Sequence, residues 1–400
     1  MAGPPSADVT AERRVRATLP PAGALFLCLF ASQAALIAVS PVLAEVARDF
    51  DVSTAAAGQL RSVSGLVAGF AAVGMGRLTR RLGLRDLLIA GLVVLAAGSL
   101  LSALAPSFEV LAAAQVAVGA GVAVVLAGGL AAAAEWTSPE RRSHALSWAL
   151  VGQPAAWIVG MPVIGLVGDW SWRWGWIAVP LAASLAALAV VAPRVSDAPT
   201  ETGTGGWRLL REDLEVAGWA AGELLAFSAW AGTLVYAGAL YVESYGASPG
   251  TAGVLLGLAA VAYLPGNFIA RRWAGEPTPR AALVVLPLIA AGLVAVFGAY
   301  RPELWVSAAV LSVLAFVGGA RTMIASARGL EVCAHRRLFG MRLRAGATQF
   351  GYLLGSALGG VALATAGYPG MGWCFAALFV LAALPHLFGS VPDRRLSRRA

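Results

Sequence analysis

Three charged residues of this sequence lie inside long apolar stretches, and they are the first candidates for chemistry. Arg61, Glu223 and Arg321 each interrupt a run of mostly apolar residues. A charge near the centre of a membrane helix costs about 2.5–3.5 kcal/mol, so such a residue is a functional candidate. Glu223 could be a proton-responsive carboxylate. The alternatives are that Arg61 extends to the membrane surface and that the other two simply mark helix ends.

The composition indicates which solvent surrounds these charges. Of the 400 residues, 59% are hydrophobic and 12% are charged, and the mean hydropathy is +0.76. Soluble domains carry about 25% charged residues. Most of the surface of this chain must therefore face lipid instead of water.

Runs long enough to cross a bilayer occur at twelve places along the chain. A helix needs about 20 apolar residues to cross a hydrocarbon layer of about 30 Å. The sequence thus predicts an all-α polytopic membrane protein with twelve spanning helices. The predicted spans are residues 22–44, 53–75, 86–105, 109–134, 145–168, 174–192, 216–242, 250–270, 281–299, 304–326, 343–366 and 371–390.

The distribution of arginine predicts the orientation of these spans. The chain has 29 arginines and no lysine, and its net charge is +8. If both termini are cytoplasmic, only Arg48, Arg173 and Arg301 fall in loops on the opposite side, and basic residues are enriched in cytoplasmic loops. We expect a multi-pass protein of the cytoplasmic (inner) membrane. A nucleic-acid-binding protein would instead gather its arginines on one surface.

The cysteines and histidines give no sign of a metal or cofactor site. Cys28, Cys333 and Cys374 have neither the pairing nor the spacing of a disulfide framework or a zinc site. The three histidines do not cluster in the sequence. We therefore expect no cofactor.

Similar residues recur in the two halves of the chain. Gly76 followed by Arg81 ends the second run, and Gly266 followed by Arg271 ends the eighth. Because corresponding runs are six apart, the halves should have the same orientation, as in transporters built from parallel repeats. The predicted parts are an N-terminal half, a polar cytoplasmic linker and a C-terminal half with a short basic tail, at residues 1–192, 193–215 and 216–400.

Short motifs in and between the runs resemble those of the major facilitator superfamily. Residues 76–85 resemble the family's G-x-x-x-D-R-x-G-R loop, and residues 139–145 resemble its P-x-x-R-x-x-A segment. Residues 152–165 resemble the antiporter signature of the drug-efflux branch, and Trp172-Arg173 resembles the W-R that opens the sixth span. The resemblance covers nearly the full length. It implies two six-helix bundles around a central cavity.

The resemblance also implies parts that move. The loop after the second span would latch the cytoplasmic side, although ordinary positive-inside charge is the alternative; its residues are Gly76, Arg80, Arg81, Gly83 and Arg85. Small residues in the fifth and eleventh spans would let the halves slide, with plain close packing as the alternative. These residues are Gly160, Pro162, Gly165, Gly355 and Gly359.

Two motif positions depart from the family pattern. The family's aspartate in the loop is Arg80 here, so a latch through that carboxylate cannot operate as usual. The family's cavity arginine in the fourth span, which is linked with proton coupling, corresponds to Gln115. Arg61 lies at a similar depth from the same side and could supply the missing charge.

In the resembled family, the seventh and tenth spans line the cavity. Glu223 and Arg321 lie at matching depths in these spans, so we predict that they form an ion pair or share a network. Other cavity candidates are polar or aromatic, and each could instead be a packing residue. They are Gln33, Gln115, Gln153, Trp157, Trp230, Tyr236, Tyr263, Asn267, Gln349 and Tyr352.

Together these features favour a secondary transporter that exports a small amphipathic molecule by alternating access, driven by proton influx. Metabolite uptake and a non-transporting sensor on the same scaffold are the alternatives. A membrane-embedded enzyme would need paired acids or a histidine–acid constellation, which we do not find. Without lysine there can be no P-loop and hence no ATPase site. The expected partners are a small-molecule substrate, protons and the lipid bilayer, and no nucleic acid.

Overall fold

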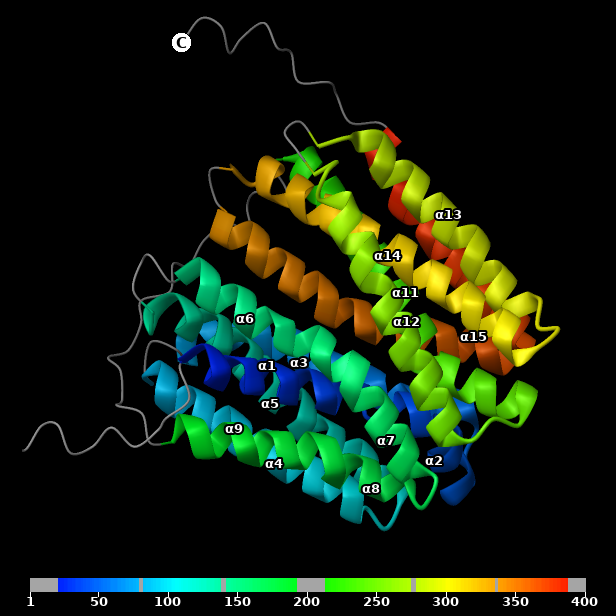
Figure 1. Ribbon diagram of the computed structural model, residues 1–400, viewed down its shortest axis with the longest axis horizontal. Helices are drawn as coiled ribbons and strands as arrows, with labels where there is room; N and C mark the ends of the chain where they lie inside the picture. The colour runs from blue at the N-terminus through cyan, green and yellow to red at the C-terminus, as the bar shows by residue number, and fades with distance from the viewer. Residues whose placement is uncertain are drawn as a thin grey trace, which may run out of the picture.

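The computed structural model is a bundle of α-helices, and the residues that it describes contain no β-strand. It describes residues 21–78, 82–137, 142–192, 213–274, 278–334 and 337–387. Most of the predicted linker therefore lies outside the described residues. Figure 1 shows that the helices before the linker pack together at the lower left, and that those after it lie at the upper right.

The N-terminal half contains α1 to α9. Its helices are α1 (Pro21–Ile37), α2 (Leu43–Asp49), α3 (Thr54–Leu78), α4 (Leu84–Leu104), α5 (Phe108–Glu135), α6 (Arg142–Ala155), α7 (Met161–Gly168), α8 (Trp172–Trp176) and α9 (Ala182–Val191). A short 3₁₀ turn, η3 (Ser40–Val42), joins α1 to α2. Two π-helical turns, Ala156–Gly160 and Ile177–Leu181, join α6 to α7 and α8 to α9.

The C-terminal half contains α11 to α15. Its helices are α11 (Leu214–Tyr245), α12 (Pro249–Ala270), α13 (Arg280–Ala299), α14 (Leu304–Val332) and α15 (Arg337–Leu387). The backbone of α15 is not helical at Ala366 and Gly367, where Gly367 has φ 64°. Glycine adopts this left-handed conformation without steric cost. The break divides α15 into two crossings.

The helices occupy all twelve predicted positions. Among the described residues, ten segments are long and apolar enough to cross a membrane, and one of them, Leu343–Leu387, contains the break in α15. The 25-residue helix α3 occupies the predicted second span but is not among the ten. The predicted all-α fold of two six-helix halves is therefore confirmed.

Prolines explain why the fifth and sixth spans are irregular. Pro162 follows one π-helical turn and Pro180 lies inside the other. A proline lacks the backbone N–H, and its ring clashes with the carbonyl four residues earlier. A locally widened turn accommodates both effects, and such turns occur often at functional sites.

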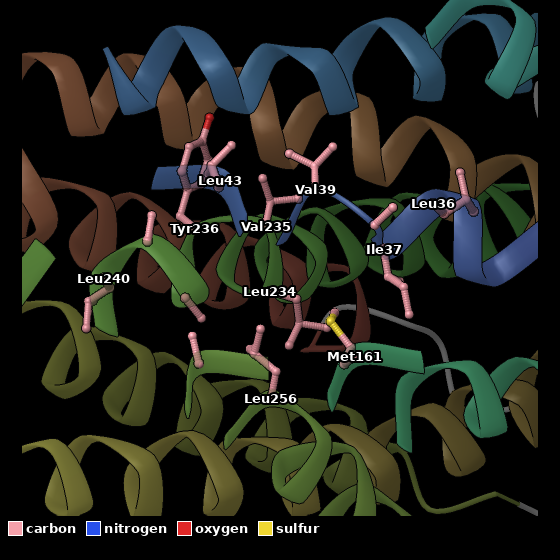
Figure 2. Packing of buried hydrophobic residues seen from close by; sticks show 14 of the residues in the cluster. Leu36, Ile37, Val39, Leu43, Met161, Leu234, Val235, Tyr236, Leu240 and Leu256 are labelled. Carbon is pink, nitrogen blue, oxygen red and sulfur yellow. The ribbon is translucent and has the colours of Figure 1, made fainter. Parts of the chain in front are cut away.

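The two halves meet through three sets of helices: α3 packs on α15, α7 on α12, and η3 with α2 on α11. Figure 2 shows the apolar core where α1, α2, α7, α11 and α12 come together. Both halves contribute to this core, whose labelled side chains are Leu36, Ile37, Val39, Leu43, Met161, Leu234, Val235, Tyr236, Leu240 and Leu256.

Glycines bring α7 and α12 into backbone contact. A Cβ atom added at Gly253 would lie 2.5 Å from the carbonyl oxygen of Met161, and one added at Gly165 would lie 2.9 Å from the Cα of Gly253. In lipid, close packing of this kind is a main source of helix association. The halves thus depend on glycine for their contact here.

Polar contacts join the halves at the same end of the molecule. The Gly250 amide, in the first turn of α12, donates a hydrogen bond of 2.8 Å to Asp169 Oδ1. Ser62 and Ser356 share a hydrogen bond of 2.7 Å between their hydroxyl groups, and Thr54 donates to Glu243. This closed end contains the loops at residues 50–53 and 169–171 and lies toward the lower right of Figure 1.

Replacing Gly253 with leucine should destabilise the contact between α7 and α12. Overpacking a well-packed contact costs typically about 1–3 kcal/mol. The thermal unfolding midpoint of purified Gly253→Leu protein should therefore fall. Gly292→Leu is the matched control, since no atom lies within 4 Å of its added Cβ. Equal midpoints for the two variants would contradict the close approach described above.

Candidate functional site

The predicted ion pair between Glu223 and Arg321 is present in the structure. Arg321 Nη2 lies 2.6 Å from Glu223 Oε1, and each side chain is only 7% exposed. The same nitrogen donates a hydrogen bond of 3.1 Å to the carbonyl oxygen of Gly222. Since α11 and α14 supply the two partners, the pair ties together the seventh and tenth spans.

A second arginine binds the same carboxylate. Arg344 Nε, on α15, donates to Glu223 Oε2 at 3.1 Å. Arg344 stands at the edge of the predicted eleventh span, and this contact was not predicted from the sequence. The structure starts α15 at Arg337. Arg344 therefore lies about two turns inside the helix, where a charge needs a partner.

Two guanidinium groups surround one carboxylate here. Without the charge of Glu223, Arg321 would remain buried without this counter-charge, which is strongly unfavourable. The charge of Glu223 and the positions of the two arginines therefore depend on each other. His386 lies close by: a Cβ added at Gly222 would be 2.9 Å from His386 Nε2. This contact was not predicted from the sequence.

Arg61 is buried between the two halves and does not reach the membrane surface. Its residue is 3% exposed, and its Cζ lies 3.8 Å from the centroid of the Tyr352 ring on α15. Its Nη1 donates a hydrogen bond of 2.7 Å to Ser64 Oγ. The alternative that Arg61 extends to the surface is therefore wrong.

The predicted cavity residues fall into two groups. Five are partly exposed, namely Gln153, Trp157, Trp230, Tyr263 and Asn267. The other five are buried, namely Gln33, Gln115, Tyr236, Gln349 and Tyr352. The first group contains a stacked pair, Trp230 and Tyr263, with ring centroids 6.2 Å apart. These partly exposed side chains are the ones that a substrate could contact without rearrangement of the core.

Two of the buried candidates have structural partners. The Tyr236 hydroxyl donates to the carbonyl oxygen of Ser356 at 2.7 Å, which joins α11 to α15. Gln115 Nε2 donates to Ser102 Oγ at 3.0 Å, which joins α5 to α4. Gln115 stands where the resembled family has its cavity arginine, and here its amide group bonds within the N-terminal half.

The small residues of the fifth and eleventh spans face different partners. Gly165 and Pro162 contact α12 across the two halves, whereas Gly355 and Gly359 pack within the C-terminal half, against α11 and its neighbours. A Cβ added at Gly160 would come no closer than 3.4 Å to another atom, which is ordinary contact. Close packing at the division between the halves is thus found for the fifth-span residues Pro162 and Gly165.

Part of the predicted gating loop lies outside the described residues. This applies to Arg80 and Arg81, while Gly76 lies in α3. Gly83 precedes α4 in extended conformation, and Arg85 Nη1 pairs with Asp86 at 2.7 Å. Arg85 also donates to the carbonyl oxygen of Ala192 at the end of α9, a favourable position for a cation. In this structure Arg85 binds within its own half.

A second charged cluster lies near the ends of α11, α13 and α14. Glu215 pairs with Arg280 at 2.6 Å and also with Arg328, and Arg328 pairs with Glu331 at 2.7 Å. In the sequence, Arg280 and Arg328 contribute only to the cytoplasmic arginine bias, and these ion pairs were not predicted. No group of three metal-ligating side chains occurs in the part of the chain that the structure describes.

Comparison with known proteins identifies the family. The model of the Major Facilitator Superfamily matches residues 25–327. Two chloramphenicol efflux pumps of Mycobacterium tuberculosis, from strains CDC 1551 and H37Rv, are each 33% identical over 148 residues. That match spans 37% of this chain and 36% of each pump, so it covers about a third of either protein.

Solved transporters share the fold. A bacterial homologue of the human lysosomal transporter Spinster, inward-facing and unoccupied, has a TM-score of 0.73 at 15% identity and covers 92% of this chain and 95% of its own. A mutant of the nucleoside transporter NupG has a TM-score of 0.75 at 12% identity and covers 92% and 99%. At such identities only the fold is shared. The matched family model and this fold together show that the chain belongs to the Major Facilitator Superfamily, as a multi-pass membrane transporter.

Proposed function

We propose that this transporter exports a small amphipathic molecule across the cytoplasmic membrane in exchange for protons. The observation that carries the proposal is the buried carboxylate of Glu223 between the guanidinium groups of Arg321 and Arg344. Three helices of one half meet at this carboxylate, and its charge decides whether they stay together.

The orientation of the protein gives this structure its place in the transport cycle. With both termini in the cytoplasm, as the arginine bias favours, the closed end faces the outside. The inter-half contacts at Asp169, Gly250 and Ser62 then seal the outer side. A sealed outer side is what an inward-facing conformation requires, and in alternating access that conformation receives substrate from the cytoplasm.

Proton binding at Glu223 would loosen its helices. A neutral Glu223 no longer attracts Arg344, whose side chain is 35% exposed and can turn toward water. Arg321 is buried and has no such freedom, so α14 must shift or find another acceptor. The protonated and ionised forms therefore favour different packings of α11, α14 and α15, which is what coupling requires.

Two features favour export of an amphipathic compound. The partly exposed candidates include Trp157, Trp230 and Tyr263 and carry no charge, which suits a largely apolar ligand. The partial similarity to chloramphenicol efflux pumps supports the outward direction. Gln115 does not supply the family's usual charge in the fourth span, so we assign coupling to the cluster around Glu223.

Transport into inverted membrane vesicles tests the function directly. Vesicles that contain the protein should accumulate labelled chloramphenicol, or another amphipathic compound of a test panel, when their lumen is acidic. A protonophore should abolish this accumulation, because protons leaving the lumen drive the exchange. Equal accumulation with and without the gradient would contradict proton coupling. Accumulation only in right-side-out vesicles would indicate uptake instead.

Neutralising Glu223 should remove the coupling. Glu223→Gln keeps the size of the side chain but cannot ionise, so gradient-driven accumulation should fall by about tenfold or more, the equivalent of 1.4 kcal/mol. Glu109→Gln is the matched control, because Glu109 is exposed in the first turn of α5. Gradient dependence that persists in Glu223→Gln would exclude this residue from coupling.

The same cluster predicts an order of stability. Glu223→Gln leaves two arginines without their acid and should cost about 3–5 kcal/mol, the usual effect of breaking a buried pair. Arg321→Gln should cost less, since Arg344 still binds Glu223. The double variant should lose less than the sum of the two, because the partners interact. Thermal unfolding midpoints of the three purified variants check this order, and strictly additive losses would contradict it.

A further inference from the structure

The guanidinium group of Arg61 has an unoccupied hydrogen-bonding edge. Nη1 donates to Ser64 Oγ at 2.7 Å, whereas Nε and Nη2 are buried without a hydrogen-bond partner. These two nitrogens form the side-on edge of the guanidinium, with parallel N–H bonds. Such an edge matches the two oxygens of a carboxylate.

No described acid compensates the charge of Arg61. The ion pairs among the described residues do not include it. Its main partner is the ring of Tyr352, with Cζ 3.8 Å from the centroid. A cation–π contact stabilises a desolvated cation less than a paired anion does. The charge is thus only partly balanced.

Other polar side chains that can form hydrogen bonds lie near Arg61. Gln349 Oε1 is buried without a hydrogen-bond partner, and Gln33 Nε2 donates to the Tyr352 hydroxyl at 3.5 Å. Gln349 lies close to α3, since a Cβ added at Gly65 would be 3.2 Å from its carbonyl oxygen. Gly65 is one turn from Arg61. A fixed cation, the amide of Gln33 and an aromatic ring thus gather where α3 meets α15, and Gln349 lies one turn of α15 from Tyr352.

We propose that Arg61 is the cationic group of an anion-binding site between α3 and α15, covered in this conformation by Tyr352. Arg61 belongs to the N-terminal half and Tyr352 to the C-terminal half, so separation of the halves, or rotation of the ring, uncovers the guanidinium. The ligand is an anion, for which the free edge favours a carboxylate. This deepens the proposed function, on which it rests, by giving the amphipathic substrate an acidic group.

A matched pair of ligands tests the site. Purified full-length protein in lipid nanodiscs is titrated calorimetrically with 2-naphthoate and with 2-naphthamide, which share the ring system and differ in charge. The acid should bind about ten- to a hundredfold tighter than the amide, the range for a hydrogen-bonded charge. Arg61→Gln should remove this preference. Arg61→Lys should keep part of it, because lysine retains the charge but not the two-bond edge.

Two more variants separate this role from a structural one. Tyr352→Ala removes the ring that competes with the anion, so it should bind 2-naphthoate more tightly than the unaltered protein. Arg48→Gln is the matched control: Arg48 pairs with Glu45, its side chain is 66% exposed, and its loss should leave the preference intact. Thermal unfolding midpoints show whether each variant is folded.

The outcomes distinguish the sources of the anion and the two proposals. Equal affinity for acid and amide without chloride binding, or a preference that survives Arg61→Gln, overturns the site. The same protein is also titrated with chloride. Chloride binding that requires Arg61, without a preference for 2-naphthoate over 2-naphthamide, supports an anion site that is filled from the medium. That result overturns the proposal that the substrate carries an acidic group. Binding is measured without a proton gradient. A preference for the acid that requires Arg61 therefore supports the anion site even if gradient-driven transport is not observed. Gradient-driven transport likewise supports the proposed function even if the preference is absent.

Discussion

Burial of charge away from water is the constraint on which the rest of this structure depends. In hydrocarbon, an isolated ion is so unfavourable that each buried charge must find compensation inside the protein. Glu223, Arg321 and Arg344 satisfy this requirement together, because one carboxylate accepts from both guanidinium groups. The consequence is mechanical: this cluster adds an electrostatic tie among α11, α14 and α15 to the close packing of α15 on α11.

The halves are joined by a different kind of contact. Among the described residues, every ion pair lies within one half. The halves meet instead through apolar side chains, glycine backbones, hydrogen bonds in which at most one partner is charged, and the cation–π contact of Arg61 with Tyr352. Lipid provides no hydrophobic force between helices, so these contacts depend on close packing. Strong internal ties and weaker ties across the division favour motion of each half as a unit.

Hydropathy predicts where the helices lie in the sequence, but it does not predict which way their side chains face. The apolar runs predicted all twelve spans, because hydrocarbon leaves backbone groups no partner outside the helix. Depth along the helix also follows from counting residues, which is why the pairing of Glu223 with Arg321 could be predicted. Rotation about the helix axis depends on packing partners distant in sequence. The sequence alone therefore does not predict that the polar groups of Tyr236 and Gln115 bond to neighbouring helices.

Arg344 and Arg61 show two further ways in which sequence falls short. The predicted span starts at residue 343, which places Arg344 at its very edge, where hydropathy is least informative. The helix starts at Arg337, so Arg344 lies about two turns inside it. Extension of Arg61 to the membrane surface was one of the alternatives, because the residue is near a helix end. The close packing of α3 on α15 removes that path, and Tyr352 covers the guanidinium instead. A charge held by an aromatic ring from the opposite half is balanced only while the halves touch there. Closure of this end of the molecule and stabilisation of the Arg61 charge by Tyr352 therefore occur together. An anion that replaces the Tyr352 ring competes directly with this closure.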